Sequence, residues 1–160
     1  KSCEAINGVG DDAIAVAQKL SAFSGLAIVV PPFKENLLSQ YHAQISDSST
    51  LKSCFRTNKA YAGLHFPFKQ VEGGWVPDPS SRYFSEDIPY ALCVLKGLAE
   101  LTNVATPWTD KIIFFAQKIM NKEYLTPDGK LAGRDVGETA APQAYGLTLD
   151  KLFEEQKPKL

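Results

Sequence analysis

Apolar residues recur every three or four positions in several stretches of the chain, the spacing that places them on one face of an α-helix. The first stretch covers residues 11–23 and is followed by Gly25, and glycine commonly terminates helices. A second helix is predicted after Pro31-Pro32 and before the polar run 46–50. A third, shorter helix is predicted for residues 51–56.

The strongest helical pattern covers residues 87–102. Its apolar stripe consists of Ile88, Leu92, Leu95 and Ala99. Thr106 and Pro107 then provide a helix cap followed by proline at the first helical position. The next stripe consists of Ile112, Phe115, Ala116 and Ile119. Two long helices should therefore pack as a hairpin, with the first of them central and buried.

The remaining segments carry weaker signals. Residues 26–30, LAIVV, have the composition of a short strand. Between residues 59 and 81, glycines and prolines interrupt both the helical and the strand spacing of apolar residues, so this segment is predicted to be a loop. A loop of that length inside a compact domain more often has a function than not. A last short helix is predicted within residues 147–156. The fold class expected is all-α, as a single compact multi-helix domain covering residues 1–160.

Composition narrows the classes of protein to consider. A chain of 160 residues with 44% hydrophobic residues can bury one sizeable core. Because 17 basic and 18 acidic residues nearly balance, nucleic-acid binding has little electrostatic basis. The apolar runs are shorter than the roughly 20 residues that span a bilayer, so no membrane partner is expected. Three widely spaced cysteines fit reduced thiols and a cytoplasmic location.

The glycines of "NGVGDDAIAVAQKL" invite comparison with the turn that binds a dinucleotide pyrophosphate. No apolar strand precedes Gly8 and Gly10, and a strand is part of that motif. Asp11 and Asp12, at the predicted helix start, would occupy the free N–H groups and repel a diphosphate. We interpret these glycines as residues that mark the boundary of a helix. No residue of this chain is assigned to cofactor binding.

The segment "PDPSSRYFSEDIPYAL" carries the most suggestive chemistry, because it brings Arg82, Glu86 and Asp87 to the start of the central helix. A guanidinium binds a carboxylate with two parallel hydrogen bonds, and Asp87 is suited to hold an ammonium group or to orient a catalytic imidazole. Together they suit a zwitterionic substrate. The structural alternative is that Asp87 only caps the helix and that Arg82 pairs with Asp87 or Glu86.

Other sites find less support in the sequence. The acidic residues and the two histidines, His42 and His65, lack the spacing of zinc or calcium ligands, so no metal site is predicted. His42 follows a tyrosine on a predicted helix, and His65 borders the long loop. Neither is assigned a catalytic role.

Three segments resemble a known family: "CFRTNKAYAGLHFP", "SRYFSEDIPYALCVLKGLAELTNVATPWTDKII" and "GRDVGETAAP". They are similar to the C-terminal α-helical domain of the opine dehydrogenases, the octopine and nopaline dehydrogenase family. The resemblance implies reductive condensation of an amino acid with a 2-oxo acid such as pyruvate, with NAD or NADP as cofactor. It places the substrate-binding arginine at Arg82 and its acidic partner, the candidate catalytic residue, at Asp87, with Glu86 beside them.

The resemblance also implies what this chain lacks. The family binds its cofactor mainly through an N-terminal dinucleotide-binding domain, which would be a partner of this domain, and its proton-transfer histidine lies before the region matched here. No turnover is therefore expected from these residues alone, and the chain is interpreted as part of a longer enzyme or a separately encoded half. A homodimer is a further expectation. The alternatives are a stand-alone non-catalytic ligand-binding or dimerisation module, and the helical domain of a related hydroxy-acid dehydrogenase.

Overall fold

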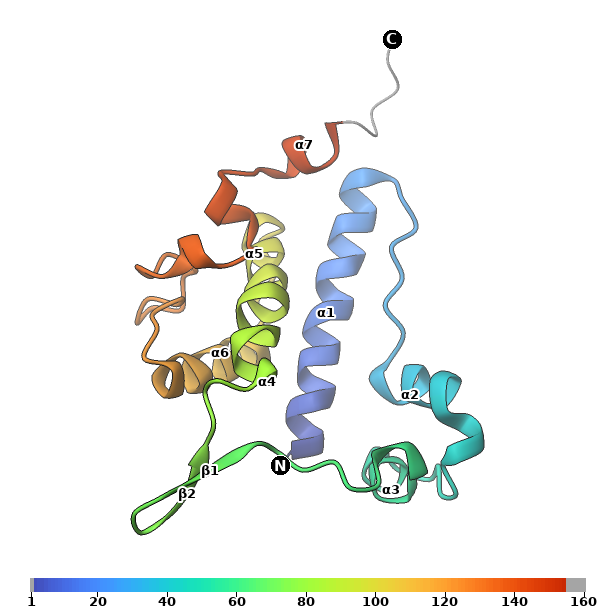
Figure 1. Cartoon of the computed structure of the whole chain (residues 1–160). Helices are drawn as coiled ribbons and strands as arrows, with labels where there is room; N and C mark the ends of the chain where they lie inside the picture. Colours follow the sequence, from blue (N-terminus) through green and yellow to red (C-terminus); the bar gives the residue numbers. More distant parts are fainter. Residues whose placement is uncertain (1, 155–160) are drawn as a thin grey trace.

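The computed structural model describes residues 2–154 and confirms the all-α class, with one small β-hairpin added (Figure 1). The helices are α1 (Ser2–Ser24), α2 (Phe33–Tyr41), α3 (Leu51–Thr57), α4 (Arg82–Ser85), α5 (Cys93–Leu101), α6 (Pro107–Met120) and α7 (Leu149–Leu152). The strands are β1 (Phe68–Val71) and β2 (Gly74–Pro77). No helix within residues 2–154 is long and apolar enough to cross a membrane.

Helix α1 lies between two groups of helices, with α5 and α6 on one side and α2 and α3 on the other (Figure 1). Three clusters of buried side chains follow from this arrangement. The largest joins α4, α5 and α6 to the segment after them, and includes Phe84, Ile88, Cys93, Ile113, Tyr124 and Leu125. The second joins α1 to α5 through Val16, Leu20 and Ala99, and the third joins α2 to α3 through Leu37, Leu51 and Cys54.

Helix α1 begins nine residues earlier than predicted, so the expected start at Asp11 is wrong. The additional turns form because Cys3 and Ile6 pack against the α2–α3 cluster, a tertiary contact that outweighs the low helix propensity of two glycines. The interpretation that these glycines mark a helix boundary is also wrong, because both lie inside α1. A Cβ atom on Gly8 would overlap the ring of Trp108, so this glycine allows α6 to approach α1 closely.

The end of α1 agrees with the prediction. Gly25 adopts φ +73°, and its N–H donates to the carbonyl of Ser21 at 2.9 Å. The strand predicted for residues 26–30 is wrong, because this segment is extended but has no neighbouring strand among the described residues. Ile28 is held instead by Ser21, whose hydroxyl bonds both its N–H and its carbonyl at 3.0 Å, and Val29 is 81% exposed.

The predicted loop 59–81 contains the antiparallel hairpin of β1 and β2, in which Val71 pairs with Gly74 and Phe68 with Pro77. The two-residue turn Glu72-Gly73 joins the strands, and Gly73 takes φ +86°, a conformation that glycine adopts without strain. All four residues of β1 are exposed. The usual alternation of buried and exposed residues is therefore absent, and the sequence pattern did not indicate a strand.

The predicted helix 87–102 consists of a π-helical segment, Ile88–Leu92, followed by α5. Helix α6 starts at Pro107 as predicted, but its buried face is rotated from the expected stripe. Thr109, Ile113, Ala116 and Gln117 are buried, whereas Phe115 is 57% exposed. The difference arises because two polar residues of α6, Thr109 and Gln117, face inward and have buried hydrogen-bond partners.

The segment after α6 returns across α5. The amide of Gln143 donates to the carbonyl of Gly97 at 3.0 Å, and any side chain at Gly97 would overlap Gln143 or Pro142. The short helix predicted near the end of the chain is confirmed as α7, and residues 155–156 of that prediction lie outside the described residues. All three cysteines are free thiols.

Candidate functional site

A tight turn delivers Arg82 to the start of α4. The carboxylate of Asp78 accepts hydrogen bonds from the N–H of Ser80 at 3.0 Å and from its hydroxyl at 2.7 Å. These bonds hold the pKa of Asp78 below its ordinary value. The N–H of Ser81 then donates to the carbonyl of Asp78. One turn of helix follows, in which Phe84 is buried in the core while Arg82 is exposed.

Arg82 and Glu86 form an ion pair one helical turn apart. The guanidinium Nη2 lies 3.4 Å from the Glu86 carboxylate, and the two side chains are 73% and 57% exposed. The structural alternative is therefore correct for this pair. An exposed pair of this kind is weak, so the guanidinium keeps donors that face solvent and can bind a ligand carboxylate.

Asp87 does not cap a helix, because its side chain makes no capping hydrogen bond to the π-helical segment that follows. The Asp87 side chain is exposed and forms no hydrogen bond or ion pair with any residue between 2 and 154. The structure thus brings Arg82 and Glu86 into contact and leaves the Asp87 carboxylate available.

The Asp87 side chain lines a groove of about 830 Å³ between α1 and the α4–π-helical segment. Of the described residues that line the groove, Asp87 is the one with a carboxylate, and most of the others are apolar. The apolar lining includes Ile6, Val9, Val30, Phe33, Ile88 and Ile112. Arg82 and Glu86 do not line it. A ligand that contacts both Arg82 and Asp87 would therefore extend beyond the groove.

Stacked aromatic side chains fix the loop before β1 against α4. The ring of Phe66 lies parallel to that of Tyr83, with centroids 6.3 Å apart, and edge-on to that of Phe84 at 6.0 Å. Phe66 and Tyr83 also line the groove. The long loop of the sequence thus contributes one residue, Phe66, to the lining of the groove beside Asp87.

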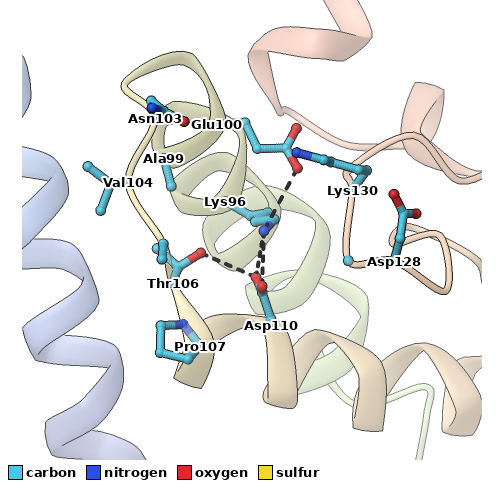
Figure 2. Close-up of a pocket in the computed structure, with 12 residues that line it drawn as sticks. Lys96, Ala99, Glu100, Asn103, Val104, Thr106, Pro107, Asp110, Asp128 and Lys130 are labelled. Atoms are coloured by element: carbon cyan, nitrogen blue, oxygen red, sulfur yellow. Dashed lines mark hydrogen bonds and ion pairs between the residues drawn. The ribbon is translucent and has the colours of Figure 1, made fainter.

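A second cavity, of about 410 Å³, lies between the end of α5 and the start of α6 (Figure 2). Three of its charged groups, those of Lys96, Glu100 and Asp110, bind one another. The ammonium of Lys96, a residue only 7% exposed, lies 2.8 Å from the Asp110 carboxylate and 3.8 Å from that of Glu100. Thr106 donates a further hydrogen bond to Asp110.

These contacts give the second cavity a structural role. Glu100 also accepts a hydrogen bond from the N–H of Leu131 at 2.8 Å, which fixes the returning chain on α5. Sequence reasoning missed Lys96 because it lies within the apolar helix pattern. Glu100, four residues later, was the available signal, since oppositely charged residues at that spacing meet on one helix face.

Gly8 and Gly10 do not form the turn that binds a dinucleotide pyrophosphate. Both lie inside α1, where the backbone N–H groups are used within the helix, and the described residues before them, from Ser2 onward, are helical as well. Residues 2–154 also contain no group of three potential metal ligands. His42 and His65 are both exposed, and neither lines the groove beside Asp87.

Comparisons with known proteins identify the family of this chain. Residues 1–120 match the family model described as NAD/NADP octopine/nopaline dehydrogenase, alpha-helical domain. The chain is 40% identical over 156 residues to tauropine dehydrogenase of Arabella iricolor, covering 92% of this chain and 38% of that protein. It is 46% identical over 121 residues to octopine dehydrogenase of Pecten maximus, covering 75% of this chain and 30% of that protein.

A solved structure of octopine dehydrogenase with NADH and L-arginine superposes with a TM-score of 0.86 at 37% identity, covering 98% of this chain and 40% of that one. This chain therefore spans about two fifths or less of these relatives. The match of sequence and fold shows that the chain belongs to the octopine/nopaline dehydrogenase family, of which it contains the α-helical domain.

Proposed function

We propose that this chain is the substrate-binding helical domain of an NAD(P)-dependent opine dehydrogenase. Family membership supports the proposal, as do the relatives named tauropine, octopine and opine dehydrogenase. Solved structures of octopine dehydrogenase are described with NADH together with L-arginine, agmatine or pyruvate. The observation that carries the proposal is the Asp87 carboxylate, which has no partner within residues 2–154 and lies five residues from an exposed arginine.

The reaction class joins the amine nitrogen of an amino acid to the carbonyl carbon of a 2-oxo acid with loss of water. A reduced nicotinamide, held by a separate dinucleotide-binding domain, supplies the hydride that converts the resulting C=N bond to a secondary amine, with one proton added at nitrogen. The residues described here bind and orient the two substrates.

Each side chain of the candidate site has a distinct role in this proposal. The Arg82 guanidinium binds the carboxylate of the 2-oxo acid, because its planar donors match that group. The Asp87 carboxylate binds the amino group of the amino acid as an ammonium. After this group has passed one proton to a base, Asp87 accepts a hydrogen bond from the neutral amine and so places its nitrogen for attack on the carbonyl carbon. Glu86 orients Arg82 through the ion pair between them. A hydroxy acid has no ammonium for Asp87 to bind, and so the site favours an amine substrate.

The arginine is tested by Arg82→Ala in the full-length enzyme that contains this chain. We expect kcat/KM for pyruvate to fall about 10- to 100-fold, the factor that corresponds to losing a hydrogen-bonded charge partner. Arg134→Ala is the matched control, because Arg134 is similarly exposed and also pairs with a neighbouring carboxylate. Wild-type kinetics in the Arg82 variant, with unchanged circular dichroism, would remove this residue from the site.

The carboxylate is tested by Asp87→Asn, which keeps the shape of the side chain and removes its charge. We expect KM for the amino acid to rise at least about tenfold, while KM for pyruvate changes much less. Asp11→Asn serves as control, since Asp11 is an exposed carboxylate of α1 that does not line this groove. An equal rise in both KM values would argue against an ammonium-binding role.

A further inference from the structure

The groove beside Asp87 restricts which amino acid side chains fit the proposed site. Asp87 is its one carboxylate among the described lining residues, and the polar groups that accompany it are the phenol of Tyr83 and the amide of Asn36. The side chains that α1 contributes are those of Ile6, Val9 and Ala13, all of them apolar. The side chain of an amino acid substrate bound at Asp87 would therefore contact an apolar surface in the groove.

Charge complementarity decides between the kinds of side chain that could enter. One carboxylate neutralises one cation, and in the proposed function Asp87 already holds the ammonium of the amino acid. Glu86 is directed to Arg82 and does not line the groove. Asp11 and Glu35 line a different hollow, which shares Phe33 with this groove. Among the described residues, a guanidinium or a second ammonium in this groove would find no further counter-ion, whereas an aliphatic side chain would contact apolar surface.

We infer that the amino acid substrate carries an uncharged, predominantly aliphatic side chain, such as that of valine, leucine or methionine, and that this side chain occupies the Asp87 end of the groove. The inference rests on the proposed function and specifies its substrate class. Burial of such a side chain is favourable by about 25 cal/mol per Å² of apolar surface removed from water. The groove is large enough for all three side chains.

A substitution at Ala91 tests directly whether the side chain of the amino acid substrate lies in this groove. It is exposed, lines the groove and belongs to the π-helical segment that follows Asp87. Ala91→Leu adds a branched side chain at the cavity surface and reduces the room for a substrate side chain. Ala22→Leu is the matched control, because Ala22 is an exposed alanine of α1 that does not line the groove.

The experiment measures kcat/KM with NADH and pyruvate for glycine, valine, leucine, methionine, arginine and taurine, in the full-length enzyme and in both variants. We expect leucine or methionine to exceed arginine and taurine at least tenfold in the wild type. In Ala91→Leu the ratio of leucine to glycine should fall at least tenfold, within the range for changing a few carbon atoms in an apolar pocket. Ala22→Leu should leave that ratio unchanged.

The outcomes separate the inference from the function on which it rests. Preference for arginine or taurine overturns the inference and leaves the opine dehydrogenase proposal intact. An equal loss for all amino acids in Ala91→Leu also overturns it, because the groove would then not contact the side chain. Failure of every amino acid to condense with pyruvate or another 2-oxo acid would overturn the proposed function itself, and the inference with it.

Discussion

The carboxylate of Asp12, on α1, accepts two hydrogen bonds from Thr109 at the start of α6, one from the backbone N–H and one from the hydroxyl, both at 2.8 Å. The same oxygen accepts the N–H of Trp108 at 3.1 Å. The residue that precedes α6, Thr106, makes no capping bond of its own. A residue 97 positions away therefore caps α6, and this contact fixes α6 against α1.

Loss of this cap should destabilise the fold. We expect Asp12→Ala to lower the free energy of unfolding by about 2–4 kcal/mol, because Asp12 is only 5% exposed and its removal leaves two N–H groups without an acceptor. Urea denaturation followed by circular dichroism measures the change. Asp11→Ala, one residue away on the exposed face, should cost less than about 0.5 kcal/mol. Equal effects of the two variants would show that the cap contributes little.

The two glycines of α1 should respond in opposite directions to the same substitution. Gly8→Ala forces the added methyl group into the ring of Trp108 and should destabilise the chain by about 1–3 kcal/mol. Gly10→Ala places its methyl group at an ordinary 3.6 Å from Phe33. It should therefore stabilise the helix by up to about 1 kcal/mol through helix propensity. Thermal unfolding of both variants tests the difference, and a stabilised Gly8 variant would contradict the packing described here.

The ion pair between the buried Lys96 and the partly buried Asp110 should be coupled more strongly than an exposed one. A double-mutant cycle with Lys96→Met and Asp110→Asn should give a coupling free energy of about 1–3 kcal/mol. The cycle with Lys122→Met and Glu138→Gln is the matched control, because that pair is as close, at 2.6 Å, but more exposed. Its coupling should stay below about 1 kcal/mol. Similar values for both pairs would mean that burial does not strengthen the contact.

Alkaline pH should destabilise the fold through two buried acids. Burial raises the pKa of Cys93 from 9.0 to about 12, and burial, with nearby groups adding to the effect, raises that of Tyr124 from 10.0 to about 12. Between these values the unfolded chain releases protons that the folded chain retains, so stability falls as pH rises. The slope should reach about 1.4 kcal/mol per pH unit for each group.

The two contributions can be separated by pH. Between pH 9 and 10, the fall of the denaturation midpoint with rising pH should come mainly from ionisation of Cys93 in the unfolded chain. Cys93→Ala should therefore make the midpoint less dependent on pH in this range. Tyr124→Phe should flatten the profile only above pH 10. A wild-type profile that stays level from pH 8 to 11 would be inconsistent with two buried acids that keep their protons.

Much of the local structure was predictable from the chain itself. The end of α1 at Gly25, the start of α6 at Pro107 and the helices after Pro32 and Thr50 follow from turn and cap residues within a few positions. The clustering of Arg82, Glu86 and Asp87 was also predictable, because these three residues lie within six positions of one another in the sequence. Their place on an exposed turn follows from the apolar residues beside them, since Phe84 and Ile88 must be buried.

The amino-acid order by itself determined where most helices lie and which polar groups gather at the start of α4, because propensity, capping and turn formation act between near neighbours. Only the tertiary structure decided that Asp12 caps α6, that Gly8 receives Trp108, and that Asp87 borders a groove whose other wall is α1. Those relationships join residues more than 70 positions apart. They depend on how the helices pack, and no periodicity within one helix encodes that.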